Sequence, residues 1–102
     1  MSWATHHIEL LQQGIQVRFR PLGNSMAPRI KSGQLCTVEP VPLDTIKAGD
    51  VVLCSVGRSD YLHLVKEVFR TKDGSPYFAI GNNRGNINGT TTGVYGKLIA
   101  VE

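Results

Sequence analysis

The chain has 102 residues, of which 41% are hydrophobic and 19% charged, with a formal net charge of +3 and a pI near 9.1. This length suits one domain with a single core, and no apolar run reaches the roughly 18 residues that a membrane-spanning helix requires. The N-terminus lacks the basic and apolar regions of a secretory signal, so we expect a cytoplasmic protein without a membrane anchor.

The charges and cysteines indicate neither a nucleic-acid surface nor a metal site. Eleven Lys and Arg residues are scattered among eight acidic residues and form no basic run, whereas nucleic-acid binding usually relies on a clustered basic face. Cys36 and Cys54 have no metal-ligand spacing, so we expect two buried free thiols. His6 and His7 are adjacent and point in different directions on a helix, which predicts surface residues and no metal site.

A short N-terminal helix and a series of strands follow in chain order. Residues 4–13 have the apolar spacing of a helix that Gly14 ends. Strands are predicted over residues 15–20, 34–38, 51–56, 61–69, 77–80 and 94–101. The apolar run 51–56 predicts a strand buried on both faces. Residues 40–42 are expected to be extended, and the Asn- and Gly-rich residues 81–93 a long loop. The sequence therefore predicts one mainly β domain over residues 1–102, with the helix in 1–14 and the β core in 15–101.

One serine stands in a setting that is typical of a nucleophile. The motif Gly23-Asn24-Ser25-Met26-Ala27-Pro28 follows the alternating run 15–20, which would deliver Ser25 to the end of a strand. A serine hydroxyl needs a base, and His63 is the best candidate because a neutral imidazole accepts a proton at physiological pH. Lys66 is a second base nearby, but a period of two places it on the opposite face of the strand.

Several motifs together resemble a known superfamily. The serine box, Gly33, Gly49-Asp50-Val51-Val52, Leu62-His63-Leu64-Val65, Gly81-Asn82-Asn83-Arg84 and Gly96-Lys97-Leu98 resemble, in this order, the type I signal peptidases and the LexA-type self-cleaving repressors. The resemblance covers residues 15–101. It implies a compact domain of coiled antiparallel sheets and a serine peptidase without metal or cofactor. It also implies Ser25 as the nucleophile and His63 as the base, as in the histidine-using branch.

The resemblance extends to the residues around this pair, with two acids replaced by amides. The superfamily has aspartates where this chain has Asn82 and, by spacing, Asn88. Asn88 can still orient the histidine by a hydrogen bond, but it cannot stabilise an imidazolium by charge. The oxyanion is expected to be held by backbone N–H groups around Ser25 and Met26, with Asn24 and Asn82 nearby. An extended substrate would add along a strand edge.

Three functions follow from these observations. The leading prediction is a serine endopeptidase for limited processing of a peptide or protein substrate. The missing acids favour a second, a catalytically silent domain that binds a peptide or partner protein. A third, a DNA-associated regulator, rests on the basic pI and the repressor resemblance. The Asn88-Gly89 pair also suggests spontaneous deamidation, which would restore an acid at the supporting position.

Overall fold

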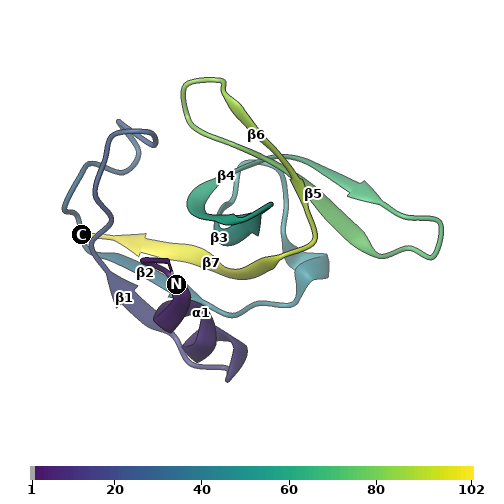
Figure 1. The fold of residues 1–102 in the computed structure, drawn as a ribbon, viewed down its shortest axis with the longest axis horizontal. Helices are drawn as coiled ribbons and strands as arrows, with labels where there is room; N and C mark the ends of the chain where they lie inside the picture. Colours follow the sequence, from purple (N-terminus) through teal and green to yellow (C-terminus); the bar gives the residue numbers. More distant parts are fainter. Residues whose placement is uncertain (1) are drawn as a thin grey trace.

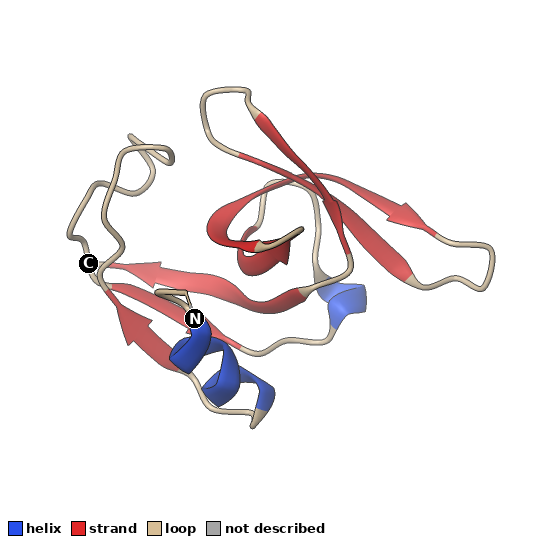
Figure 2. Ribbon diagram, in the orientation of Figure 1, coloured by secondary structure: helices blue, strands red, loops and turns tan. Residues whose placement is uncertain are grey.

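The computed structural model describes residues 2–102 as one short helix, one 3-10 turn and seven strands (Figures 1 and 2). In chain order these are α1 (Thr5–Gln12), β1 (Val17–Phe19), β2 (Cys36–Glu39), η1 (Leu43–Thr45), β3 (Val51–Val56), β4 (Ser59–Arg70), β5 (Pro76–Gly81), β6 (Ile87–Thr91) and β7 (Val94–Val101). The predicted mainly β fold with a short N-terminal helix is confirmed.

All seven strands belong to one antiparallel sheet. The strand order is β1-β2-β7-β3-β4-β5-β6, so the C-terminal strand β7 lies between β2 and β3 and joins the two halves of the sheet (Figure 1). Strands β3, β4 and β5 follow one another as hairpins. The first hairpin turns at Gly57, whose φ of 60° suits a tight turn that a side chain would strain.

Strand β3 is buried on both faces, as its continuous apolar run predicts. Val51 and Leu53 belong to the core cluster under α1 and β1, whereas Val52 and Cys54 belong to a second cluster with Phe78. Alternate residues of a strand point to opposite faces, so β3 contributes to both clusters. This places β3 and its neighbour β4 at the rigid centre of the domain.

The two cysteines are free and buried, as expected. The Cys54 thiol donates to the carbonyl oxygen of Tyr61 at 3.6 Å. Burial, with a smaller contribution from the charge of Asp60, raises the pKa of Cys54 to about 12, and burial also raises the pKa of Cys36. Thiols that stay protonated at neutral pH act as packing groups rather than nucleophiles.

The prediction of a loop over residues 81–93 was wrong in part, because it contains strand β6. Asn and Gly have low strand propensity, but β6 pairs with β5 through Phe78–Thr91 and Ile80–Gly89, and this pairing overrides local preference. Other strands differ from prediction only at their ends. Residues 15, 16 and 20 lie outside β1, and 34 and 35 lie outside β2.

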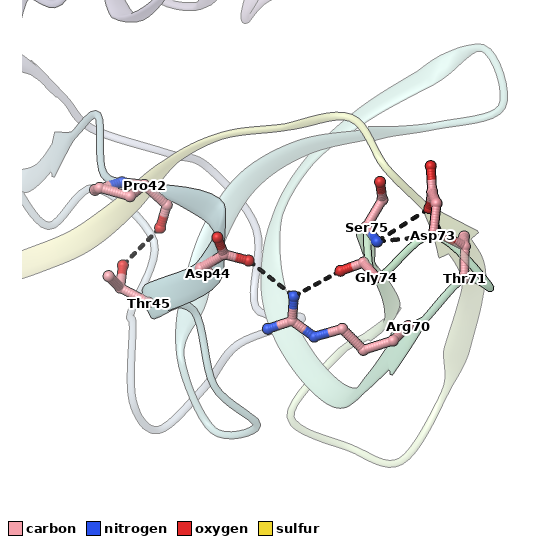
Figure 3. Close-up of polar contacts among 8 residues, drawn as sticks. All are labelled: Pro42, Asp44, Thr45, Arg70, Thr71, Asp73, Gly74 and Ser75. Atoms are coloured by element: carbon pink, nitrogen blue, oxygen red, sulfur yellow. Dashed lines mark hydrogen bonds and ion pairs between the residues drawn. The ribbon is translucent and has the colours of Figure 1, made fainter.

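The end of the β4–β5 hairpin is fastened to η1 by polar contacts (Figure 3). The Arg70 guanidinium donates through Nη1 to Asp44 Oδ1 and to the carbonyl oxygen of Gly74, both at 2.8 Å. In the turn itself, the backbone N–H of Ser75 donates to Asp73 Oδ1 at 3.2 Å. The Arg70 and Asp44 side chains are 50% and 74% exposed, so this ion pair contributes at most about 1 kcal/mol.

Candidate active site

Ser25 lies at the centre of a turn in the segment between β1 and β2. The backbone N–H of Ala27 donates to the carbonyl oxygen of Asn24 at 3.1 Å, which makes Ser25 and Met26 the two central residues of the turn. The N–H of Asn83 donates to the Ser25 carbonyl oxygen at 3.1 Å, and Asn83 Nδ2 donates to that of Ala27 at 3.2 Å. The loop between β5 and β6 therefore holds this turn in place.

His63 reaches the serine from β4. Its side chain is 8% exposed, and its Nε2 lies 3.0 Å from Ser25 Oγ. This is a hydrogen-bond distance within the range that proton transfer requires. Of the two bases that the sequence offers, His63 thus faces the serine. The structure brings together two residues that are 38 positions apart in the chain.

Asn88 contacts the other nitrogen of the imidazole. The distance between His63 Nδ1 and Asn88 Oδ1 is 2.7 Å. An amide oxygen only accepts hydrogen bonds, so Nδ1 carries the proton and Nε2 is left free to accept one from the Ser25 hydroxyl. The three side chains thus form a chain of hydrogen bonds in the order that a serine triad uses.

A β-bulge places Asn88 in this position. Gly81 pairs with Ile87 and Ile80 pairs with Gly89, so Asn88 is the one residue of β6 without a partner in β5. A bulge redirects the side chain at the extra residue and is common beside active sites. Gly89 follows with a φ of 139°, a backbone conformation that favours glycine.

The imidazole is poised to be neutral. Burial lowers the pKa of His63 below its ordinary value of 6.5, and the hydrogen bond with Asn88 opposes this shift only in part. Desolvation disfavours the charged imidazolium, so the neutral ring dominates at pH 7. A neutral His63 is the form that can accept a proton from Ser25.

Tyr61 is a residue of the site that sequence reasoning missed. Its ring is stacked on the His63 ring, with 4.8 Å between centroids and 26° between planes. Positions two apart in a strand share a face, and this spacing was a signal that could have found it. Tyr61 thus covers one side of the imidazole and limits its rotation.

The expected oxyanion and substrate residues fall into two groups. Within residues 2–102, the backbone N–H groups of Ser25 and Met26 have no hydrogen-bond acceptor, and Asn24 is exposed beside them. Asn82, in contrast, is 9% exposed, and its Oδ1 accepts from the N–H groups of Arg84 and Asn86 at 2.8 and 3.0 Å. The side-chain oxygen of Asn82 therefore organises the β5–β6 loop.

A cavity of about 670 Å³ opens beside Ser25 and His63. Its walls come from the N-terminal segment, the end of β1 with the loop that follows, and β4. His7 lines it and stacks on Phe19 with 4.6 Å between ring centroids. The expectation that His7 is a simple surface residue was therefore incomplete, because this aromatic contact half-buries it, whereas His6 is exposed.

In the part of the chain that the structure describes, no three His, Cys, Asp or Glu side chains are grouped to hold a metal ion. Nor is any helix over residues 2–102 long and apolar enough to cross a membrane. No protein-family model matches the chain, and comparisons with curated proteins and with solved structures find no match. The interpretation of the site therefore rests on the contacts among Ser25, His63 and Asn88.

Proposed function

We propose that this domain is a serine endopeptidase, a relative of the signal-peptidase and LexA-type superfamily, that cleaves a peptide or protein substrate. The observation that carries this proposal is the hydrogen-bonded series Ser25 Oγ to His63 Nε2 at 3.0 Å and His63 Nδ1 to Asn88 Oδ1 at 2.7 Å. A serine next to a buried, neutral imidazole with a fixed tautomer is the arrangement that activates a hydroxyl.

In this reaction, Ser25 Oγ attacks the carbonyl carbon of the scissile peptide bond while its proton moves to His63 Nε2. The C–O bond forms and the carbonyl π electrons move to the oxygen, which gives a tetrahedral oxyanion. The imidazolium then donates the proton to the leaving amine as the C–N bond breaks. Water then attacks the acyl carbon while His63 Nε2 takes its proton, and that proton passes to Ser25 Oγ as the ester C–O bond breaks, which releases the carboxylic acid product and restores Ser25.

The turn around Ser25 supports the stabilisation of the oxyanion. The free N–H groups of Ser25 and Met26 lie next to the nucleophile, and backbone donors that are already oriented lose no free energy to reorganisation. Removing one such donor typically costs about 10²- to 10³-fold in rate. No metal or cofactor enters these steps.

A second candidate is a catalytically silent domain that binds an extended peptide at the same site. It is favoured by the amide at position 88, because Asn88 orients His63 but supplies no negative charge to the imidazolium. In a serine triad the change from Asp to Asn lowers turnover by about 10⁴-fold through the wrong histidine tautomer, whereas here Asn88 Oδ1 keeps the proton on Nδ1 and only the negative charge is missing. The two candidates differ in whether Ser25 reacts with an electrophile.

A peptidyl aryl phosphonate distinguishes them, because it reacts covalently with activated serines. We expect labelling at Ser25, located by peptide mass, with none in Ser25→Ala and about 10²- to 10⁴-fold slower labelling in His63→Ala. Ser59→Ala, which removes an exposed hydroxyl of β4, is the matched control and keeps the wild-type rate. If the folded protein is not labelled at any pH between about 6 and 9, the endopeptidase proposal is wrong.

A further inference from the structure

The cavity beside Ser25 has an apolar floor. Met26, Ile30 and Leu62 line it and are 4%, 3% and 6% exposed. Its volume of about 670 Å³ lies within the range of sites that bind small organic groups. This space is far larger than the methyl group of an alanine side chain needs.

The N-terminal segment adds an aromatic wall. Trp3 lines the cavity and lies against Phe19 with 5.5 Å between ring centroids. The segment is fastened to β4 because the Ser2 hydroxyl donates to the Asp60 carboxylate. Trp3 nevertheless stays 51% exposed, so an occupant of the cavity can still bury much of its surface.

The charged groups of the lining do not select a charged occupant. They are one carboxylate, Asp60, and one guanidinium, Arg20, together with His7, whose pKa is lowered by burial and by His6. The Asp60 carboxylate accepts from the hydroxyls of Ser2 and Ser55. Arg20 donates through Nη1 to the carbonyl oxygen of Gly33 at 2.9 Å. Each ion thus already has a hydrogen-bond partner in the chain, and because one carboxylate and one guanidinium line the cavity, the lining as a whole favours neither sign of charge.

We infer that this cavity binds a large apolar side chain, leucine or an aromatic residue, next to the scissile bond, and that Trp3 determines this specificity. Ser25 and His63 belong to the lining of the same cavity, so a side chain seated in it lies close to the reacting carbonyl. Leu22 also lines the cavity, is 87% exposed and offers further apolar surface. The position of the scissile bond in this inference rests on the proposed peptidase function. The binding of an apolar side chain in the cavity does not depend on that function.

The first test uses a matched series of acetyl-dipeptidyl aryl phosphonates that differ only in the residue next to phosphorus: Ala, Leu, Phe or Glu. We expect the Leu and Phe probes to label Ser25 about 10- to 100-fold faster than the Ala probe, because each buries more apolar surface. The Glu probe is expected to be slowest. Labelling that is equally fast or faster with Ala overturns the inference and leaves the endopeptidase proposal standing.

A second test measures binding in Ser25→Ala, without any reaction. The chain has a single Trp and two Met residues, so Trp3 emission and the Met26 methyl resonance report independently on the wall and floor of the cavity. Both signals should change at a concentration of acetyl-Ala-Ala-Phe-amide at least tenfold lower than the concentration of acetyl-Ala-Ala-Ala-amide that produces the same change. This response supports the cavity inference even if no phosphonate reacts and the peptidase proposal fails. An equal response or none overturns it.

The role of Trp3 is tested by variants. Trp3→Ala should lower the ratio of Phe-probe to Ala-probe labelling by about tenfold, and Trp3→Phe, which keeps an aromatic ring, should retain most of it. Ile99→Ala is the matched control, since Ile99 is 46% exposed and lies outside the cavity. If the ratio survives in a folded Trp3→Ala protein, Trp3 does not determine the specificity. Should that variant fail to fold, Trp3→Gln, which also removes the aromatic ring, takes its place in the Ser25→Ala background, and a Met26 response to acetyl-Ala-Ala-Phe-amide that is as strong as with Trp3 contradicts the assignment.

Discussion

Replacing Asn88 by aspartate exchanges the side-chain amide next to His63 for a carboxylate, and so adds the negative charge that the candidate site lacks. The Asn88 oxygen lies 2.7 Å from His63 Nδ1, so a carboxylate there would face the imidazolium that forms during proton transfer. Asn88 is exposed whereas His63 is buried. The pair would therefore interact through a medium between water and protein interior.

The expected magnitude follows from Coulomb's law. Two opposite charges about 4 Å apart attract by about 1 kcal/mol in water and about 4 kcal/mol at an effective dielectric constant of 20. Because about 1.4 kcal/mol corresponds to one pKa unit and to a tenfold rate, Asn88→Asp should raise the pKa of His63 by about 1 to 3 units. The labelling rate at a pH above the new pKa should rise by about 5- to 1,000-fold.

The assay is the phosphonate labelling rate from pH about 5 to 10, with the His63 ring titrated by NMR in parallel. Because a raised pKa keeps His63 protonated up to a higher pH, the labelling rate falls on acidification at a higher pH than in the wild type. The rate of the variant should therefore exceed the wild-type rate most at alkaline pH. Asn86→Asp adds the same charge to the same loop and is the control, since the Asn86 side chain does not contact His63. If the pKa of His63 rises but the alkaline labelling rate does not, charge at position 88 does not support the reaction and the triad interpretation is wrong.

Further predictions follow from the same elements. In aged protein, the backbone nitrogen of Gly89 should attack the side-chain carbonyl of Asn88 and expel ammonia, and water should then open the resulting succinimide. Peptide mapping detects this deamidation as a gain of about 1 Da at Asn88. An unchanged mass excludes it. Because the pKa of His63 is lowered in the folded state, the unfolded chain binds the proton more readily, so the free energy of unfolding should fall as pH drops below 6.5. Urea titrations at several pH values check this, and His63→Gln should flatten the decline. Gly81→Ala would bring a Cβ to 2.2 Å from the Asn86 carbonyl oxygen, so the β5–β6 loop must shift. We expect the free energy of unfolding to fall by about 1 to 3 kcal/mol and the labelling of Ser25 to be slower. Wild-type stability and labelling rate would contradict the close contact.

Some of the fold could be predicted from the sequence because the signal was local. The apolar run of β3 has the predicted bounds, Val51–Val56, since a strand buried on both faces needs no alternation to be recognised. Strand β6 was missed because Asn88 and Gly89 interrupt its strand-favouring Ile and Thr residues and an Asn- and Gly-rich segment precedes it, so that pairing with β5 decides the conformation. Strand pairing depends on the residues of both strands, so it cannot be recognised from the residues of one strand alone.

Part of the candidate site could likewise be predicted from the sequence, and part could not. Ser25 and His63 were singled out by their local sequence setting and assigned as nucleophile and base through a resemblance in the order of motifs, and no periodicity indicated the distance between them. The bulge that turns Asn88 towards His63 depends on the register between β5 and β6, which composition does not encode. The stack of Tyr61 on His63, in contrast, follows from a spacing of two in a strand. It could have been predicted from the sequence.

The segment that carries Ser25 has no strand partner between the end of β1 and the start of β2, whereas His63 belongs to the interior of the sheet. At its tip the segment is held by two hydrogen bonds from Asn83 and by the contact of Ser25 with His63, and the side chains of Met26 and Ile30 are buried in the core. A segment without strand pairing opens locally at a lower free energy than the paired strands of a sheet. Mild denaturant should therefore separate Ser25 from His63 while the sheet persists, so the reactivity of Ser25 is lost at a lower urea concentration than the circular dichroism signal of the strands. We therefore expect the loss of Ser25 reactivity and the unfolding of the sheet to be two separate events in this domain.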